Sequence, residues 1–320
     1  MKFTTPLLAA ACALLIQPHV AAQEWPTKSV RIMVGSAPGG GTDAMARAVA
    51  DRLGPLLKHP VVVENRPGVS NTIAADVTAK STDGHTIVMG VSTAHAIAPH
   101  LLKLGYDNDK DLIPVVFVGA VPNVLVVNNA LPVDSVQSLI KLAKSKPGQL
   151  NYATSGSGST QHIAAELFKD QAGVFITHIP YRGSGPALVD LVGGQVQMSF
   201  DTMPSVIGQI KAGRIKALAV ASARRNPQLP TLPTMAEAGL NGVEMSAWYG
   251  IYMPASTPKA VQDRVYAEVT KVLAMPETQT RLGAIGADLT PLTQAQFAAF
   301  HASENKRYAE LIAKKNIKLD

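Results

Sequence analysis

Two short segments combine glycines, hydroxyl side chains and a following helical pattern. One is Asn151 to His162 (NYATSGSGSTQH), and the other is Gly35 to Asp43 (GSAPGGGTD). The glycines leave backbone N–H groups uncovered by Cβ atoms, and the serines and threonines add hydrogen-bond donors without charge. At a helix N-terminus, unpaired N–H groups and the positive end of the helix dipole favour an anion. The two loops predict the two halves of a cradle for a carboxylate or phosphate, although each alone is also compatible with a plain capped turn.

Enzyme motifs that use such loops are incomplete in this chain. No Gly-x-x-x-x-Gly-Lys-Ser/Thr loop and no Gly-x-Ser-x-Gly elbow occurs. Gln161 stands where a dinucleotide fingerprint needs its third glycine. His162 and Glu166, one helical turn apart, are the weak candidates for a metal pair or a base, without a third ligand at the usual spacing. We expect no catalytic residue, no metal and no cofactor, and we interpret His162 as a first-turn residue that contacts the loop or its ligand.

The elements that position these loops are strands that alternate with helices. Periodicity predicts strands at 29–34, 61–63, 86–91, 114–119, 150–154, 175–179, 196–200 and 215–220. Helices are predicted at 44–57, 135–146 with Asp134 as N-cap, 159–172 with Ser159 or Thr160 as cap, 186–192, 204–212, 259–274, 277–285 and 294–314. This alternation predicts an α/β chain with parallel strands and helices on both faces. In such sheets ligands bind beyond the carboxyl ends of the strands, where both loops lie.

The N-terminal residues predict export. Lys2 precedes an apolar stretch that runs to about Ile16, and small residues lead up to Ala22, which is the pattern of a secretory signal peptide at 1–22 cleaved after Ala22. The stretch is shorter than the roughly 20 apolar residues of a membrane anchor. Cys12 could suggest a lipoprotein, but the apolar region continues past it. After cleavage, 298 of the 320 residues remain without a cysteine, so the fold must be held by core packing without disulfides.

Composition limits the class of partner. With 47% hydrophobic residues, a chain of this length buries a sizeable core and suggests two domains. After cleavage, 28 lysines and arginines stand against 23 aspartates and glutamates, with no cationic run longer than Lys314-Lys315. Cations spread in this way argue against a nucleic-acid partner. The balance is compatible with an anionic ligand and equally with a merely basic soluble protein.

Further motifs extend over nearly the whole exported chain and occur in the order of a known family. The sequence resembles the Bug family of periplasmic solute receptors, the extracytoplasmic binding proteins of tripartite tricarboxylate transporters. The matching segments are 38–43 (PGGGTD), 64–68 (ENRPG), 83–86 (DGHT), 92–96 (STAHA), 146–148 (KPG), 151–153 (NYA), 156–159 (GSGS), 180–183 (PYRG), 186–187 (PA), 190–196 (DLVGGQV), 232–234 (LPT), 248–250 (WYG) and 254–258 (PASTP).

The resemblance implies a two-lobed periplasmic binding protein, type II-like, in which each lobe is a mostly parallel sheet flanked by helices and a hinge joins the lobes. Lobe 1 would comprise residues 23–122 and 252–320, and lobe 2 residues 123–251. The implied partners are a small carboxylate (a dicarboxylate, a tricarboxylate or an aromatic acid) and the inner-membrane transporter subunits, with a monomer as the default. An exported enzyme, or a ligand-sensing partner of a membrane sensor that uses the same cleft, is the alternative.

The resemblance also implies contacts to the ligand carboxylate from both loops. These are Ser36, Ala37, Gly39, Gly40 and Asp43 in lobe 1, and Ser155, Gly156, Gly158, Ser159 and Thr160 in lobe 2, with His162 beside them. The far end of the ligand would meet residues at other strand ends, namely Thr93, His95, Tyr181, Arg182, Asp201 and Thr202. Each of these has a structural alternative: Asp201 as a turn cap, Tyr181 as packing, Arg182 as a solvated charge. Arg182 in the cleft would favour a second carboxylate and Asp201 an amine or hydroxyl, and the sequence leaves both open.

Two segments depart from the family pattern. Ser36-Ala37 replaces a bulkier, often aromatic approach to Pro38, which predicts a wider cleft and a longer or aromatic acid. Trp248 and Tyr249, at the predicted crossing between lobes, could fill the same space. Gly68 to Asn71 replaces a more glycine-rich continuation.

Overall fold

The computed structural model describes residues 25–319, and the predicted signal peptide with its cleavage after Ala22 lies outside them. Within this range the chain forms nine strands, in the order β2-β1-β3-β9-β4-β7-β5-β6, with β8 paired to β4 off that path. Their bounds are β1 Val30–Val34, β2 Val61–Asn65, β3 Thr86–Val91, β4 Leu112–Asn128, β5 Asn151–Thr154, β6 Thr177–Pro180, β7 Met198–Thr202, β8 Ile215–Val220 and β9 Ser246–Pro254. The helices are α1 Gly41–Leu57, α2 Thr72–Ala79, α3 Val136–Ser145, α4 Thr160–Ala172, α5 Ser184–Gly193, α6 Met203–Lys211, α7 Lys259–Ala274, α8 Pro276–Ala284 and α9 Gln294–Lys315.

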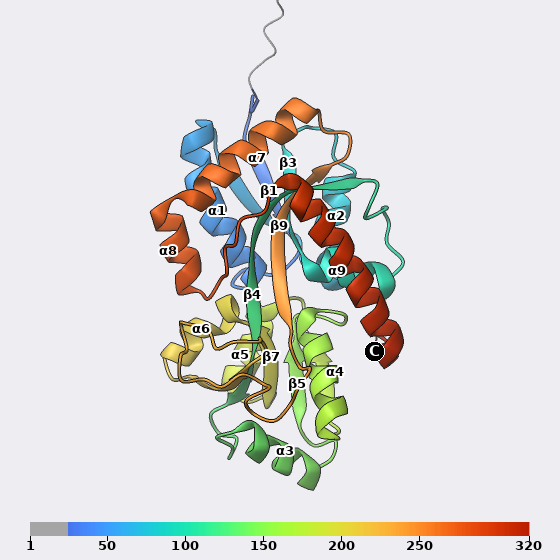
Figure 1. Cartoon of the computed structure of the whole chain (residues 1–320), viewed down its shortest axis with the longest axis vertical. Helices are drawn as coiled ribbons and strands as arrows, with labels where there is room; N and C mark the ends of the chain where they lie inside the picture. Colours follow the sequence, from blue (N-terminus) through green and yellow to red (C-terminus); the bar gives the residue numbers. More distant parts are fainter. Residues whose placement is uncertain (1–24, 320) are drawn as a thin grey trace, which may run out of the picture.

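A single long strand connects two groups of strands. The first part of β4, up to Pro122, pairs with β9, which in turn pairs with β3. From Asn123 onward β4 pairs instead with β7 and β8. Figure 1 shows β4 and β9 side by side along the long axis of the molecule, between the β1–β3 group and the β5–β7 group. Strand pairing alone does not define domain boundaries. The predicted division into one lobe of residues 23–122 plus 252–320 and a second lobe of residues 123–251 therefore stays a prediction.

The core explains why these segments form strands. In β1, Ile32 and Val34 pack against α1, whereas Met33 faces the opposite side and belongs to a cluster with Ala74 and Ala75 of α2. The later part of the strand is covered on both faces, which accounts for the apolar run Ile32-Met33-Val34. The later part of β4 repeats this arrangement, because its alternate residues belong to two different core clusters.

The last helix runs from the first group of strands toward the second. Phe297, near its start, fills the space beside Gly250 of β9, where an added Cβ would lie 2.2 Å from the phenyl ring. Near its end, Lys315 Nζ lies 2.7 Å from Asp170 Oδ2 of α4. Figure 1 shows the C-terminal end of α9 beside α4.

The predicted α/β class is confirmed, and most predicted elements form within a few residues of their expected bounds. The prediction of parallel strands is correct for β1 with β2 and β3, and for β5 with β6 and β7. It is wrong for every pair that β4 or β9 makes, because these two strands run antiparallel to their neighbours. The strand predicted at 114–119 is only part of β4, and neither β9 nor α2 was predicted.

The N-cap of α3 also differs from the expectation. Ser135, and not Asp134, caps this helix: the Ser138 backbone N–H donates to Ser135 Oγ at 3.2 Å, in a capping box. Asp134 Oδ1 instead accepts a hydrogen bond from the Ser138 hydroxyl. Ser159 caps α4 as predicted, through the His162 N–H. No helix in the described part of the chain is both long enough and apolar enough to cross a membrane.

Candidate functional site

Four helices start around one cavity, and each follows a strand. The N-caps are Gly40 for α1, Ser159 for α4, Gly183 for α5 and Thr202 for α6. The first turn of a helix carries N–H groups without a partner inside the helix, and it is the positive end of the helix dipole. Four such ends around one space create a positive potential without any charged side chain.

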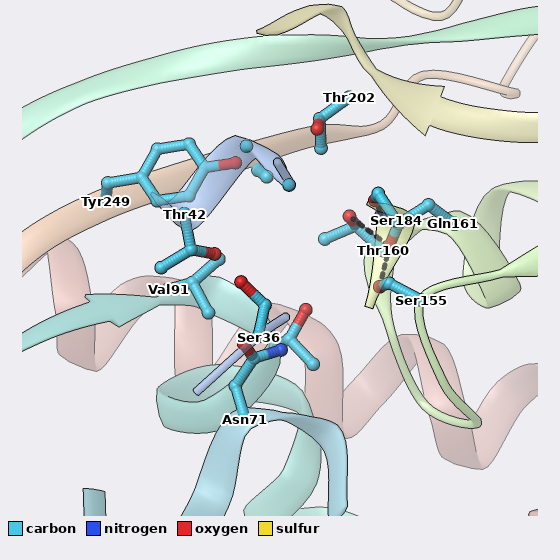
Figure 2. A pocket seen from close by; sticks show the side chains of 14 residues that line it. Ser36, Thr42, Asn71, Val91, Ser155, Thr160, Gln161, Ser184, Thr202 and Tyr249 are labelled. Carbon is cyan, nitrogen blue, oxygen red and sulfur yellow. Dashed lines mark hydrogen bonds between the residues drawn. The ribbon is translucent and has the colours of Figure 1, made fainter. Parts of the chain in front are cut away.

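The lining of the cavity is polar but uncharged. Figure 2 shows Ser36, Thr42, Asn71, Val91 and Tyr249 on one side, facing Thr202, Ser184, Gln161, Thr160 and Ser155 on the other. Gly40, Gly41, Thr93 and Ala247 complete the lining. None of these residues is acidic, basic or a histidine. An anion in this cavity would be balanced by N–H and O–H dipoles alone.

The cavity is nearly closed in this conformation. The centre of a water-sized sphere can occupy only about 20 Å³ of it, which is roughly the space of one water molecule. The two walls touch: the Ala37 N–H donates to the Arg182 carbonyl at 3.3 Å. A carboxylic acid of several carbons needs these walls further apart.

Asp43 holds the first loop in shape. Its carboxylate accepts the Gly39 N–H at 3.1 Å, Asn65 Nδ2 at 3.0 Å and Arg47 Nε at 3.0 Å. Burial raises the pKa of Asp43, but the hydrogen bonds from Arg47, Asn65 and Gly39 outweigh it, so the pKa lies below its ordinary value. Asp43 was predicted to face the ligand, whereas the structure directs its oxygens to the loop backbone and leaves it outside the cavity lining.

The second loop, residues 155–159, is fixed by a hydrogen bond to α4, the helix that follows it. His162 Nδ1 accepts the Gly158 N–H at 3.1 Å, and His162 is buried against the stacked ring of His178. His162 Nε2 and Glu166 Oε1, the weak metal or base candidates, lie 3.9 Å apart beside the loop and outside the cavity. Among residues 25–319, no three histidine, cysteine, aspartate or glutamate side chains lie close enough together to hold a metal ion.

A buried carboxylate lies directly behind the second wall. Asp201 Oδ1 accepts Ser184 Oγ at 2.7 Å, Gln161 Nε2 at 3.2 Å and the Thr202 N–H at 2.7 Å. Burial raises the pKa of Asp201 above its ordinary value, although these hydrogen bonds oppose the shift. Asp201 was predicted to contact the ligand, but in the structure it orients Gln161 and Ser184, which do line the cavity.

Two buried oxygen atoms of the first wall have no partner in the described structure. They are Ser36 Oγ and Asn71 Oδ1, and both residues line the cavity. A buried polar atom without a hydrogen bond costs about 1–3 kcal/mol. These atoms are available to a ligand or to an ordered water between ligand and protein.

The remaining predicted residues fall into four groups. Ser36, Gly40, Thr93, Ser155, Thr160 and Thr202 line the cavity, whereas Ala37, Gly39, Gly158 and Ser159 belong to the two loops without lining it. Gly156, Tyr181 and Arg182 line a neighbouring cavity. His95 is buried outside both linings and stacks on Tyr252 with ring centroids 3.9 Å apart. Burial, with His301 nearby, lowers the pKa of His95 to about 3. Direct contact of any of these residues with a ligand stays a prediction.

Sequence reasoning missed eight lining residues: Gly41, Thr42, Asn71, Val91, Gln161, Ser184, Ala247 and Tyr249. Gly41, Thr42 and Gln161 lie inside the two loops that were singled out. Ser184 follows β6 at a third strand-to-helix junction, Tyr-Arg-Gly-Ser, and that position could have indicated it. Tyr249 was named only as a residue that could fill the cleft, and Asn71 only as part of the segment that departs from the family pattern. Ala247 has no local signal, because it reaches the cavity only through the sheet order.

The fold is that of a periplasmic binding protein. The structure of the periplasmic binding protein BugD aligns with a TM-score of 0.88 and 32% identity, covering 92% of this chain and 99% of that one. A protein of R. palustris, solved with adipate, aligns with a TM-score of 0.89 and 37% identity, covering 92% and 99%.

The sequence comparison is more specific. Residues 45–317 match the model of the tripartite tricarboxylate transporter family receptor. BugT of Bordetella pertussis is 37% identical over 303 residues, which are 94% of this chain and 93% of BugT. The chain belongs to the tripartite tricarboxylate transporter receptor family. It is a solute-binding receptor and not an enzyme, as the sequence predicted.

Proposed function

We propose that this protein is exported to the periplasm through cleavage after Ala22, captures a small organic acid by its carboxylate and delivers it to the membrane subunits of a tripartite transporter. The observation that carries this proposal is the convergence of four helix N-termini on a cavity whose lining is uncharged. The related R. palustris structure with adipate supports the same class of ligand.

The proposed capture uses neutral donors on both sides of the carboxylate. Each helix N-terminus stabilises a nearby anion by about 0.3–1 kcal/mol, and hydroxyls such as those of Ser36 and Thr160 add hydrogen bonds. A carboxylate accepts about four hydrogen bonds, so it can be shared between two walls. Because the ligand contacts both walls only when they are close, it shifts the population toward a closed form.

Delivery of the ligand to the transporter depends on this link between ligand binding and closure. The two groups of strands are joined through β4 and β9, and we infer that they form two lobes that separate to admit the acid. The closed, liganded form presents both lobes together to the transporter. The divisions at 122/123 and 251/252 are part of this proposal.

The test is calorimetric titration of the chain from Gln23 to Asp320 with succinate, adipate, benzoate, aspartate and glucose. We expect at least one carboxylate to bind without being consumed, and Thr160→Val to weaken it about 10-fold or more through loss of a charged hydrogen bond. The control is Thr177→Val, an exposed threonine outside the cavity lining. Binding of glucose alone, or conversion of the ligand, would contradict the proposal.

Delivery has its own test in cells of the source organism. We expect deletion of the gene to abolish uptake of the radiolabelled ligand and the intact gene to restore it. Unchanged uptake, with an altered transcriptional response to the acid, would indicate a partner of a membrane sensor instead.

A further inference from the structure

The chain turns sharply after α9, and residues 316–319 run beside α4. Asn316 adopts the left-handed conformation with φ 49°, and the Ile317 N–H donates to the Ile312 carbonyl at 3.1 Å. This is the Schellman ending of a helix, in which an apolar residue after the turn packs against the last helical turn. Ile317 is buried in the same core cluster as Ile312 and Leu167 of α4. The turn therefore directs residues 316–319 toward α4.

The segment is anchored on α4 mainly by an apolar contact. Residues 315–318 and residues of α4 line a common cavity of about 440 Å³, and Figure 1 shows the end of α9 beside α4. Lys315 Nζ lies 2.7 Å from Asp170 Oδ2, but both side chains are partly exposed, and such ion pairs contribute little to stability. Burial of an isoleucine contributes more, so Ile317 is the main anchor.

Leu319, at the end of this segment, reaches the second loop of the site. It lines the neighbouring cavity together with Gly156 and Ser157. A Cβ on Gly158 would lie 3.3 Å from Leu319 Cδ2 and 3.1 Å from Leu101 Cδ1. Gly158 has a positive φ of 76°, which favours glycine. Two leucine side chains thus cover the loop at its most permissive residue.

Both leucines come from the group of elements that faces this loop. Leu101 directly follows the short helical turn η3 (Ala98–His100), and α9 packs on η3 and on η2 (Thr93–Ile97), which follow β3. The loop itself joins β5 to α4, which belong to the other group of strands. Separation of the two groups, as the proposed function requires, would move the leucines away from the loop.

We propose that residues 316–319 position the second loop for the ligand carboxylate, with Leu319 as the positioning residue. This proposal rests on the proposed function, because the loop is half of the carboxylate cradle. Leu319 does not line the first cavity, so it acts through the loop and not on the ligand. A loop with glycines at 156 and 158 samples many backbone conformations when it is uncovered. Covering it in the closed form removes part of the ordering entropy that the ligand would otherwise have to offset.

The test is hydrogen exchange of the backbone amides at 155–160, measured by mass spectrometry on the exported chain without ligand. We expect Leu319→Ala to speed exchange of these amides about 3- to 10-fold, because the loop opens more often. Leu319→Met keeps the apolar volume and should restore the parent rate. The matched control is Leu273→Ala, since Leu273 is also half-buried but lies in α7, outside the linings of both cavities.

Dissociation kinetics connect the loop to binding. The probe is the tightest-binding acid among succinate, adipate, benzoate and aspartate. We expect Leu319→Ala to raise its dissociation rate constant about 3- to 10-fold and to change its association rate constant less than about 2-fold. Circular dichroism melting curves of Leu319→Ala and Leu273→Ala serve as the measure of any general loss of stability.

The outcomes separate this inference from the function on which it rests. Parent-like exchange at 155–160 in Leu319→Ala, or equal acceleration there in Leu273→Ala, overturns the inference while the carboxylate cradle stands. Faster exchange with an unchanged dissociation rate constant also overturns it, because the loop would then be ordered without consequence for the ligand. Failure of every acid in the series to bind the parent chain would refute the proposed function, and the inference with it.

Discussion

Gly41 and Thr202 meet so closely across the cavity that a Cβ on Gly41 would lie 2.6 Å from Thr202 Oγ1. The same Cβ would lie 2.7 Å from the Tyr249 hydroxyl. Gly41 begins α1, Thr202 ends β7 and Tyr249 lies in β9, so three separate elements converge on a point where only a hydrogen atom fits. In this closed form, a side chain at position 41 would have to displace the Thr202 hydroxyl and the Tyr249 ring.

Gly41→Ala should hold the walls apart and weaken ligand binding on the order of 10- to 100-fold, because overpacking by one methyl group costs roughly 1–3 kcal/mol. Calorimetry measures the affinity, and small-angle scattering with ligand should show less compaction than in the parent chain. The matched control is Gly208→Ala in α6, where an added Cβ meets nothing within 4 Å. Parent-like affinity in Gly41→Ala would show that the closed form does not bind the ligand.

Asp43→Ala should destabilise the fold by about 1–3 kcal/mol, because it leaves the Gly39 N–H without its acceptor and removes one of the two acceptors of Asn65 Nδ2. The folded-state pKa of Asp43 lies below its ordinary value of 3.8, so its stabilisation is present above that pH and is lost as the pH falls through the folded pKa. Urea unfolding at pH 7 and pH 3 should show a smaller difference between variant and parent at pH 3.

An exposed ion pair provides the control for that variant. Asp263→Ala, whose carboxylate pairs with Lys259 at the surface, should change the stability by less than about 1 kcal/mol. Equal effects of the two substitutions would mean that Asp43 contributes no more to the loop than an ordinary surface charge.

Asp201→Asn should also change the pH dependence of stability, but with the opposite sign to Asp43→Ala. The folded-state pKa of Asp201 is raised, so its contribution is fully present below its ordinary value of 3.8 and is lost as the pH rises through the folded pKa. Asparagine keeps an oxygen for the three donors and never ionises. We expect the free energy of unfolding of the variant, relative to the parent, to improve from pH 4 to pH 8.

Urea titrations at closely spaced pH values measure this difference. Asp263→Asn should give no such slope, because that side chain is exposed. A constant difference between Asp201→Asn and the parent over the whole range would show that Asp201 does not change its protonation there.

Elements with strong local periodicity were predicted well. The bounds of β3, β8 and α7 agree with the prediction to the residue, because apolar spacing and flanking turn residues specify them locally. The strand β9 was missed: its Trp248-Tyr249-Gly250 segment was interpreted as a crossing between lobes. Its strand conformation is stabilised by pairing with β3 and β4, which are distant in the sequence.

In the candidate site, too, some features depend on local sequence and others on contacts between distant residues. Asp43 was predicted as a ligand contact from the family resemblance and Asp201 from its place at a strand end, and both contacts stay predictions. In the structure both carboxylates accept hydrogen bonds from residues around the cavity. Only the folded chain brings Asn65 to the first, and Ser184 and Gln161 to the second, whereas Arg47 lies one helical turn after Asp43 in the same helix.

The sequence by itself determined the α/β class, the family and two glycine-rich strand-to-helix junctions, because these depend on local periodicity and on residues close together in the chain. Tertiary structure decided that four helix N-termini share one cavity, that Asn71 and Tyr249 join them, and that a second cavity with Arg182 lies beside it. The physical reason is that the order of strands in the sheet, set by the antiparallel pairing of β4 and β9 and by packing on both faces, determines which strand ends become neighbours.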